Sequence, residues 1–520
     1  MTHTPVDARR SGAGDAPVGA LADLAIIGSG SGNTLVTPFW EGRRVVIAES
    51  GVFGGTCLNA GCIPTKMFVR PATLARSPEE AARLGVTLHT EGVDWPAIRD
   101  RIFGRIDPIS ASGERYRRDE QPHVELISQR VRLDGTHAIV AEDGTRVAAR
   151  QLVIAAGSRP VIPDVPGIEL PEVHTSETVM RLPELPTRVL VIGGGAIASE
   201  FASIFSGLGS EVIQVHRRGR LLSHTETEIA ERFTEAVGRR WDLRLNSAVR
   251  RIDPAADGDG VVVEVKAALD GADAGAGSGT AGAGSGTAGS AKAAGSGTAG
   301  ERVQVDVVLV AIGRRPNSDL VGAAEAGLDL HPDGRIAVDA EQRVLTGGVP
   351  VPGLYALGDV CTPFKLKHVA NHEARVVAHN LEHPEDLRAA RHEAVPEAIF
   401  SAPEVATVGE TEAEAAARIG AEHVTAFTQQ YGDTAYGWAL EDTEGLCKVI
   451  ADRRDGRVLG AHIVGHEASM LIQLPVMAMS FGIDAHTAAR GQYWPHPSLM
   501  EVVENALLGL DVPRGDRPPL

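Results

Sequence analysis

Two cysteines close together in the chain are the residues best suited to chemistry. Cys57 and Cys62 lie in the segment Gly54–Lys66, which reads Gly-Gly-Thr-Cys-Leu-Asn-Ala-Gly-Cys-Ile-Pro-Thr-Lys. One turn of chain at this spacing can bring two sulfur atoms within disulfide-bonding distance. Pro64 suits the first turn of a helix, and a helix that begins near Cys62 would lower the pKa of that thiol. The segment predicts a redox-active pair; two structural cysteines are the alternative.

The remaining cysteines and the composition narrow the class of protein. Cys361 and Cys447 stand apart from the pair, and we expect both to be buried structural residues. Four cysteines in 520 residues do not make the disulfide framework of a secreted protein, so a cytoplasmic setting is expected. The net charge of −18 opposes nucleic-acid binding, and no apolar stretch reaches the roughly 18 residues of a membrane span. We expect no metal site.

A glycine-rich turn near the N-terminus predicts a dinucleotide site. An apolar strand runs into Gly28-x-Gly30, and Asn33 stands where a third Gly or Ala is usual. A second apolar strand, Val45–Ala48, ends at Glu49. The glycines allow a tight turn that aims the next helix at a pyrophosphate, and a carboxylate at the second strand end can accept hydrogen bonds from both ribose hydroxyls. We therefore predict a strand–turn–helix–strand unit here.

A second unit of the same kind begins at Arg188. The apolar strand Arg188–Ile192 runs into Gly193-x-Gly195, and a further strand, Glu211–Val215, follows. Two such units in one chain predict two dinucleotide-binding folds. From about Glu393 onward, strand-like segments alternate with Ala-rich helices without a glycine fingerprint, which indicates a third, mixed α/β domain.

The second unit carries basic residues where its second strand ends. His216 stands where a site for NAD normally has an acid, and Arg217, Arg218 and Arg220 follow it. Guanidinium groups bind a 2′-phosphate through paired hydrogen bonds. The loop therefore favours NADPH over NADH, with an ordinary solvated basic loop as the alternative.

A low-complexity segment interrupts the second unit. The sequence Ala-Gly-Ser-Gly-Thr-Ala-Gly occurs three times between Ala276 and Gly300. Such a run has too little apolar surface to offset the entropy of ordering it. Because it follows the strand-like Val261–Val265 and precedes the strand-like Val305–Val310, we predict a flexible loop between two strands, without assigning it a function.

The cysteine segment resembles the active-site signature of the flavoprotein pyridine nucleotide–disulfide oxidoreductases, which include glutathione reductase, dihydrolipoamide dehydrogenase and mycothione reductase. Three further segments look like this family's two domain crossovers and its second FAD segment: Ile154–Pro160, Ala311–Asn317 and Leu354–Val360. The resemblance implies an α/β fold with two Rossmann-like dinucleotide-binding domains, for FAD and NADPH, and a C-terminal α/β dimerisation domain.

The expected organisation of the chain follows from these segments. The parts are a disordered leader (1–21), the first part of an FAD-binding domain (22–165), an NADPH-binding domain (166–315) with a flexible insertion at about 268–301, the second part of the FAD-binding domain (316–390), a dimerisation domain (391–510) and a tail (511–520).

The resemblance also implies roles for individual residues. Cys62 is the thiolate against the flavin, Cys57 attacks the substrate, and Lys66 pairs with Glu200 beside the flavin. The cofactor-binding residues implied by the motifs and the resemblance are Gly28, Gly30, Glu49, Thr56, Lys66, Gly157, Asp359, Gly193, Gly195, Arg217, Arg218 and Gly313.

His496 and Glu501 resemble the family's catalytic acid/base pair. A departing thiolate must be protonated near pH 7, where histidine titrates, and Glu501 would fix the tautomer of the imidazole. In this family the histidine acts on the disulfide of the other subunit, which implies a homodimer.

Several segments look most like those of the mycothione reductases: Lys66–Arg70, Ile102–Ile109, Tyr431–Trp438 and Gly491–Trp494. The implied reaction is the reduction of mycothiol disulfide (mycothione) by NADPH through FAD and the cysteine pair. The arginines oppose a dihydrolipoamide dehydrogenase, and the cysteine-free last residues oppose thioredoxin and mercuric reductases. Glutathione disulfide or lipoamide as substrate, flavin-only quinone reduction, a redox sensor, and a structural subunit of a 2-oxoacid dehydrogenase complex remain alternatives.

Overall fold

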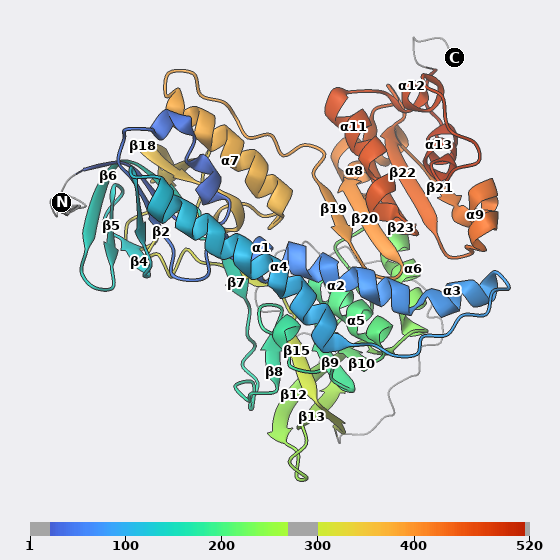
Figure 1. Cartoon of the computed structure of the whole chain (residues 1–520). Helices are drawn as coiled ribbons and strands as arrows, with labels where there is room; N and C mark the ends of the chain where they lie inside the picture. Colours follow the sequence, from blue (N-terminus) through green and yellow to red (C-terminus); the bar gives the residue numbers. More distant parts are fainter. Residues whose placement is uncertain (1–20, 269–299, 515–520) are drawn as a thin grey trace, which may run out of the picture. The chain divides into compact units, whose positions relative to one another are not determined.

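The computed structural model describes residues 21–268 and 300–514, which form two compact α/β units (Figure 1). The first unit contains the chain up to Gly55, Ala111–Gly157 and Pro316–Ala390, and the second contains Thr56–Ser110, Ser158–Arg315 and the chain from Arg391 onward. The predicted leader, the repeat insertion and most of the predicted tail lie outside the described residues. The domain boundaries expected from the sequence stay a prediction.

An eight-stranded sheet forms the first unit. Its main order is β17-β18-β6-β1-β2-β3, and β4 and β5 join it through β6. The strands from β18 to β3 run parallel, and parallel strands covered on both faces are near-continuous apolar runs. The strands are β1 (Ala22–Ile27), β2 (Val45–Ala48), β3 (Val124–Ile127), β4 (Val131–Leu133), β5 (Ala138–Ala141), β6 (Arg146–Ile154), β17 (Arg343–Thr346) and β18 (Val349–Ala356).

Apolar cores cover both faces of this sheet. Alternate residues of β1 point to opposite faces. Leu24 and Ile26 pack with Val377 of helix α7 (Lys367–Glu382) on one face, whereas Ala25 and Ile27 belong to the core on the other face. The two cores hold the carboxyl end of β1, where the first glycine turn begins, in a fixed position.

The prediction of a helix after the first glycine turn is wrong. Two short 3-10 turns, η1 (Gly32–Leu35) and η2 (Pro38–Trp40), stand in its place. Pro38 has no backbone N–H and disfavours the helical region for the residue before it, and Thr37 is extended, with φ −90° and ψ 171°. Asn33 accepts a hydrogen bond of 2.8 Å from Nε of the buried Arg117, in the π-helical turn η3 (Tyr116–Glu120), so a side-chain contact holds this segment.

The second unit contains the other predicted dinucleotide fold. Its five parallel strands follow the order β11-β10-β9-β15-β8, and the predicted strands before and after the second glycine turn are confirmed. The elements are β8 (Val173–Thr175), β9 (Arg188–Ile192), α5 (Ala196–Leu208), β10 (Glu211–Val215), α6 (Thr227–Gly238), β11 (Asp242–Arg244) and β15 (Val307–Val310).

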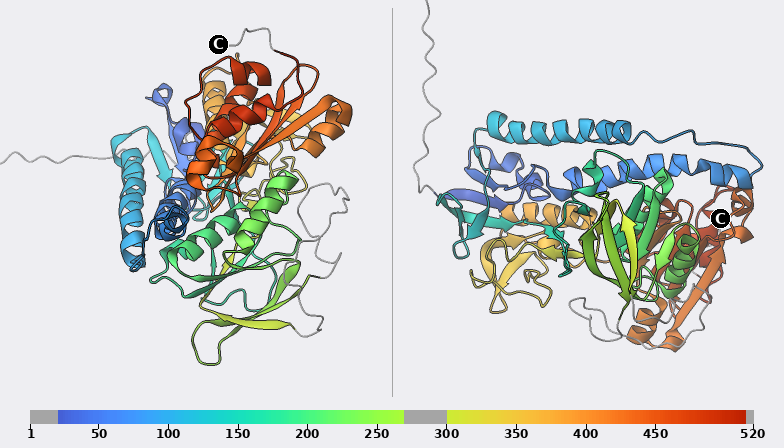
Figure 2. Two further views of the ribbon diagram at one scale, coloured as in Figure 1. Left: turned by 90° about the vertical axis from the view of Figure 1, so that its right-hand side faces the viewer. Right: turned by 90° about the horizontal axis from the view of Figure 1, so that it is seen from below.

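A three-stranded antiparallel sheet packs on this fold through a shared apolar core. In Figure 2 the yellow-green ribbons of β12 and β13 lie beside the green elements of this fold. It consists of β12 (Ser247–Pro254), β13 (Val261–Ala267) and β14 (Glu301–Val305). The prediction of a single strand over Val305–Val310 is wrong. Asp306 separates β14 from β15, and the two strands belong to different sheets. The carboxylate of Asp306 accepts a hydrogen bond of 2.9 Å from the backbone N–H of Arg188.

Stacked aromatic rings pack α2 (Cys62–Ala75) against α5 in the second unit. Phe68 of α2 lies 4.9 Å from Trp95, and Trp95 lies 5.9 Å from Phe205 of α5. Trp95 begins α4 (Trp95–Arg115), and its indole N–H donates to the carbonyl of Leu182 at 2.9 Å. The rings are buried, so the helix that begins at Cys62 has a fixed position on α5.

The C-terminal part of the second unit is an antiparallel sheet of order β19-β20-β23-β22-β21 with helices around it. Its elements are β19 (Pro396–Ile399), β20 (Glu404–Gly409), α8 (Glu412–Ile419), η6 (Ala421–His423), β21 (Val424–Gln430), η7 (Tyr431–Asp433), α9 (Ala435–Leu440), β22 (Leu446–Asp452), β23 (Val458–Gly465), α10 (Ala468–Leu471), α11 (Gln473–Phe481), α12 (Ala485–Arg490) and α13 (Glu501–Leu508). Among residues 21–268 and 300–514, no helix has the length and apolar character of a membrane span.

The remaining elements are short. They are α1 (Gly55–Asn59), α3 (Ser77–Arg83), β7 (Ser158–Pro160), η4 (Val179–Arg181), β16 (Arg314–Pro316) and η5 (Gly358–Val360).

Candidate active site

Cys57 and Cys62 lie on two consecutive helices, α1 and α2, and the prediction of a helix that begins at Cys62 is confirmed. Cys57 is half-buried, and Cys62 lies at the surface, although protein atoms surround much of its thiol. The Cys57 thiol donates a hydrogen bond to the Cys62 sulfur, and this bond, together with the Lys66 ammonium, lowers the pKa of Cys62 to about 7, against the effect of burial. A thiol with this pKa is about half ionised at pH 7, and the thiolate is the reactive form.

Lys66 and Glu200 form the predicted pair. Lys66 Nζ lies 2.8 Å from Glu200 Oε1 and 2.9 Å from Oε2. Glu200 is buried on α5 and also accepts a hydrogen bond of 2.9 Å from the backbone N–H of Phe400. The Phe400 ring lies 4.8 Å from Lys66 Nζ. The ammonium is therefore held one helical turn after Cys62 by contacts that come from distant parts of the chain.

His496 and Glu501 also form the predicted pair. Nδ1 of His496 lies 3.4 Å from Glu501 Oε1, while 70% of the histidine side chain is exposed. Glu501 is the first residue of α13, and its other carboxylate oxygen is buried with no hydrogen-bond partner in the described part of the chain. The carboxylate thus orients an imidazole whose far edge is open to a second molecule.

The first glycine turn is built around Glu49. Glu49 Oε2 accepts hydrogen bonds from the backbone N–H and the hydroxyl of Ser29, at 2.9 and 2.7 Å, and Oε1 accepts one from Gly51 N–H at 2.8 Å. Gly28 has φ +102°, and a Cβ there would lie 2.3 Å from the carbonyl oxygen of Ala155. Gly30 allows a similarly close approach of Gly55, whose Cβ would lie 2.7 Å from Gly30 Cα.

Asp359 and Gly157 lie at two further turns of the first unit. Asp359 follows β18 in η5, and the preceding Gly358, at φ +73°, donates its N–H to the buried carboxylate of Glu373 at 2.7 Å. Gly157 has φ +68°, and its carbonyl accepts the N–H of Asn317 at 3.0 Å. Thr56, another predicted cofactor-binding residue, is exposed on α1.

The second glycine turn leads into a longer helix, α5. A Cβ on Gly193, which has φ +140°, would lie 2.2 Å from the carbonyl oxygen of Ala311. Gly195 caps the N-terminus of α5, and nothing in the described chain lies within 4 Å of where its Cβ would be. This end of the helix therefore combines unpaired backbone N–H groups with open space, as a pyrophosphate requires.

The basic loop follows this turn directly. A Cβ on Gly194 would lie 2.5 Å from the ring of His216, which shows how closely the imidazole packs on the glycine turn. Burial, with Arg218 and Arg217 adding to it, lowers the pKa of His216 to about 4, so the ring is neutral at pH 7. The side chains of Arg217 and Arg218 are exposed. Gly313, at φ +138°, accepts the N–H of Val161 through its carbonyl, at 3.0 Å.

The other two cysteines are buried, as predicted. Burial raises the pKa of Cys447 to about 12 and raises that of Cys361 as well. Neither thiol carries the thiolate character that distinguishes Cys62. Within the described chain, no group of three or more His, Cys, Asp or Glu side chains is arranged to hold a metal ion.

Comparisons with known proteins agree with this geometry. The model of the family described as pyridine nucleotide-disulphide oxidoreductase matches residues 22–374, and the model of that family's dimerisation domain matches residues 395–507. The chain belongs to this family. It is an FAD-dependent NAD(P)H disulfide oxidoreductase, and its dimerisation domain implies a homodimer.

Individual relatives cover nearly the whole chain. The chain is 45% identical over 497 residues to mycothione reductase of Mycobacterium tuberculosis strain H37Rv, a match that covers 94% of this chain and 99% of the relative. It is 32% identical over 457 residues to glutathione reductase of Burkholderia cepacia, covering 87% and 91%. It is 31% identical over 502 residues to dihydrolipoyl dehydrogenase 3 of Pseudomonas putida, covering 94% and 98%.

A solved structure shows the same fold. The HOCl-induced flavoprotein disulfide reductase RclA from Escherichia coli superimposes with a TM-score of 0.75 over 94% of this chain and 99% of that one, at 24% sequence identity. At this identity the likeness supports the fold alone.

The first unit of this oxidoreductase fits FAD. A dinucleotide needs a tight turn that brings the backbone close to its pyrophosphate. Gly28 and Gly30 permit such a turn, because their Cα atoms pack closely on the Ala155 carbonyl and on Gly55. Glu49 is held in place by three hydrogen bonds from Ser29 and Gly51, which leave one of the roughly four lone-pair sites of its carboxylate, on Oε1, for a ribose hydroxyl. The donors and acceptors present therefore match the group that the family uses.

Sequence reasoning missed the residues that hold these groups in place. Ser29 occupies a position of the glycine motif to which the motif assigns no residue type. Its small polar side chain is the one feature of the sequence that could have indicated its contact with Glu49. Glu373 lies in an ordinary helical pattern, and Phe400 lies 200 positions after the glutamate that it contacts. Local sequence carries no signal for contacts of this kind.

Proposed function

We propose that this protein reduces mycothione, the disulfide of mycothiol, with NADPH, using Cys57 and Cys62 as the redox-active pair. The observation that carries the proposal is the placement of Cys57 and Cys62 on the consecutive helices α1 and α2, with the Lys66 ammonium held by Glu200 one helical turn after Cys62. The lowered pKa of Cys62 agrees with this arrangement. The mycothione substrate is supported by the 45% identity to a mycothione reductase over almost the full length of both chains.

The chemistry assigned to the cysteines is thiol–disulfide exchange. Bound FAD supplies a hydride acceptor and a route for two electrons into the cysteine pair. In the reduced pair, Cys57 attacks one sulfur of the substrate disulfide and forms a mixed disulfide, and the first thiolate leaves. The Cys62 thiolate then attacks the Cys57 sulfur, which restores the Cys57–Cys62 disulfide and expels the second thiolate.

Groups around the cysteine pair accept and donate the protons of this reaction. Because the Cys57 thiol donates a hydrogen bond to the Cys62 sulfur, it must lose its proton before it attacks. A histidine can accept that proton and return it to the departing thiolate. We assign this role to His496 of the partner subunit, supported by the 70% exposure of its side chain and by its contact with Glu501. We assign to Lys66, held by Glu200, the stabilisation of negative charge on the reduced flavin and on Cys62.

The preference for NADPH is supported by the strand end at His216. A neutral imidazole there offers no carboxylate to a ribose 2′-hydroxyl, and the exposed Arg217 and Arg218 can pair with a 2′-phosphate. Gly193 permits the tight turn against Ala311, and Gly195 leaves open space for the pyrophosphate at the N-terminus of α5.

A substrate panel tests the proposal. The purified protein is mixed with NADPH and either mycothione, glutathione disulfide or lipoamide, and the loss of NADPH is followed; NADH then replaces NADPH. We expect rapid turnover with mycothione and NADPH only. Rapid turnover with lipoamide and NADH, and none with mycothione, would overturn both the substrate and the nucleotide assignments.

Two variants make this test specific for the cysteine pair. Cys57→Ser should lose disulfide reduction and keep the reduction of quinones, which needs only the flavin. Cys447→Ala is the matched control, because its thiol is buried and has a raised pKa; it should turn over mycothione at the parent rate.

A further inference from the structure

The backbone of the basic loop between β10 and α6 is held by the glycine turn and by Asn246. Leu222 donates its backbone N–H to the carbonyl of Gly194 at 2.8 Å and has φ +49°, so the chain reverses there. The carbonyl of Arg218 accepts the N–H of Asn246 at 3.2 Å. These contacts hold the loop at Arg218 and at Leu222, and its C-terminal end is held by other groups.

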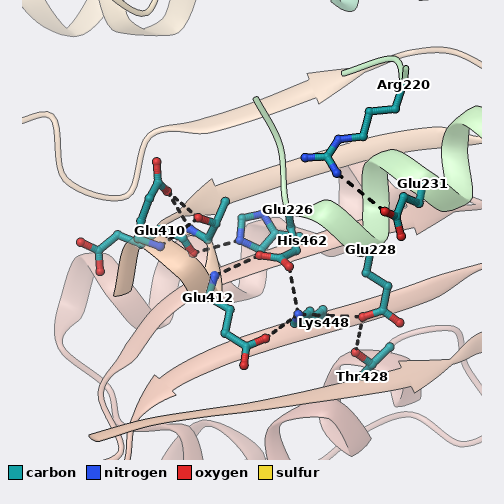
Figure 3. A network of polar contacts seen from close by, with 11 residues as sticks. Arg220, Glu226, Glu228, Glu231, Glu410, Glu412, Thr428, Lys448 and His462 are labelled. Atoms are coloured by element: carbon teal, nitrogen blue, oxygen red, sulfur yellow. Dashed lines mark hydrogen bonds and ion pairs between the residues drawn. The ribbon is translucent and has the colours of Figure 1, made fainter. Parts of the chain in front are cut away.

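The far end of the loop is Glu226, and its carboxylate contacts the dimerisation domain (Figure 3). Glu226 Oε1 lies 2.9 Å from Nζ of Lys448 on β22, and Oε2 accepts the backbone N–H of Glu412, on α8, at 3.0 Å. Lys448 also lies 2.7 Å from Glu412 Oε2 and 3.9 Å from Glu228 Oε2. Glu226 and Lys448 are both buried, at 5% and 8% exposure.

A second contact ties the same segment to the same domain. His224 Nε2 lies 3.3 Å from Glu397 Oε2 on β19. This contact is more exposed than the Lys448 cluster, with 54% of the histidine side chain accessible. The loop therefore has one buried and one exposed attachment to the dimerisation domain, and the buried one carries more of the positioning because exposed ion pairs contribute little.

Lys448 is the cation that makes the buried attachment possible. Three carboxylates surround its ammonium, and His462, which lies in the same cluster, has its pKa lowered by burial and is neutral at pH 7 (Figure 3). Although burial opposes it, the Glu412 N–H and Lys448 lower the pKa of the Glu226 carboxyl. Without Lys448, Glu226 would be a buried charge with no counter-ion, and such groups leave their sites or take up a proton.

We propose that Lys448 is a positioning residue for recognition of the NADPH 2′-phosphate, acting through Glu226 to hold the loop that carries Arg217 and Arg218. The inference rests on the proposed use of NADPH and assigns part of that specificity to the dimerisation domain. A loop held at both ends presents its arginines in place before the nucleotide arrives, so less conformational entropy is lost on binding. NADH has no 2′-phosphate and gains nothing from this arrangement.

Binding of two adenine nucleotides to the FAD-loaded protein tests the proposal without relying on turnover. Adenosine 2′,5′-bisphosphate carries the 2′-phosphate and 5′-AMP lacks it. For Lys448→Met we expect about tenfold weaker binding of the bisphosphate and less than about a twofold change for 5′-AMP. In steady-state assays KM for NADPH should rise with kcat nearly unchanged, the pattern of lost binding.

Three variants separate positioning from damage to the fold. Lys448→Arg keeps the charge and should restore most of the bisphosphate affinity. Lys448→Met combined with Glu226→Gln removes both charges, so it should be more stable than Lys448→Met while the selective loss remains. Arg418→Met is the matched control, because it removes an ion pair with Glu410 in the same domain that does not touch the loop; both affinities should stay at the parent values.

Equal weakening of both nucleotides in the folded double variant, or no change in either, would overturn the positioning role of Lys448. Failure of the underlying NADPH assignment would look different: the unmodified protein would itself bind adenosine 2′,5′-bisphosphate no better than 5′-AMP.

Discussion

Lys66 and Glu200 lie 134 positions apart in the chain and meet through two contacts, at 2.8 and 2.9 Å. The pair joins the helix that begins at Cys62 to the helix that follows the second glycine turn. The position of the ammonium group beside the cysteine pair therefore depends on a glutamate in the nucleotide-binding fold.

Replacing Lys66 with methionine should affect both stability and the thiol. Glu200 would remain as a buried carboxylate with the Phe400 N–H as its remaining partner among the contacts described here, which should cost about 3 kcal/mol of unfolding free energy. The pKa of Cys62 should rise, because the ammonium is one of the groups that lower it. Denaturant unfolding and a thiolate titration measure the two effects.

Two further variants check the cause. Lys66→Met combined with Glu200→Met should recover most of the stability while the Cys62 pKa stays above its parent value. Arg118→Met removes an exposed pair with Glu114, at 2.6 Å, and should change stability by about 0.5 kcal/mol or less. An unchanged Cys62 pKa in Lys66→Met would contradict the assigned role of the ammonium.

The stability of the reduced protein should depend on pH through Cys62. The pKa of its thiol is about 7 when folded against 9.0 in the unfolded reference, so the folded pKa is depressed. The stabilisation that this represents is fully present above pH 9.0 and is lost as pH falls through about 7.

The difference in Tm between reduced parent protein and reduced Cys62→Ser reports this contribution, because groups outside the cysteine pair titrate alike in both. The difference should shrink, in favour of the variant, as pH falls from 9 toward 6. A difference that stays constant over this range would show that Cys62 does not have a lowered pKa.

Gly28 should be needed for FAD. An alanine Cβ there would lie 2.3 Å from the Ala155 carbonyl oxygen, at a φ of +102°, so the turn would have to move. Gly28→Ala should reduce the flavin-to-protein ratio severalfold, which absorbance measures. Gly104→Ala is the control: Gly104 lies inside α4 with open space around it, and alanine there should keep full flavin content and stabilise the helix by about 0.5–1 kcal/mol. Full flavin in Gly28→Ala would contradict the predicted site.

The sequence predicted the elements that rest on local pattern. Val45–Ala48, Arg188–Ile192 and Glu211–Val215 form strands with the expected bounds, because buried parallel strands are continuous apolar runs bounded by turn residues. The cysteine helix was also predictable, since Pro64 and the spacing of the cysteines mark its start. Motif resemblance supplied the pairing of Lys66 with Glu200, which spacing alone does not give.

The two wrong predictions of secondary structure have local causes that the pattern of apolar residues does not reveal. Pro38 prevented the expected helix after the first turn, and Asp306 divided one apolar run between two sheets. The attachment of Glu226 to Lys448 joins residues 222 positions apart. In the sequence each of the two residues looks like an ordinary surface charge, so only the tertiary structure reveals the contact.

Subunit mixing tests whether the active site is shared between two subunits, since the proposed site needs the cysteine pair of one subunit and His496 of the other. Cys57→Ser and His496→Ala proteins, each nearly inactive with mycothione, are unfolded together, refolded with FAD and assayed with NADPH. Random pairing makes half of the dimers mixed, and each mixed dimer has one intact site, so about a quarter of the parent activity should return. No recovery, with mixed dimers demonstrated by mass, would contradict a site completed by the partner subunit.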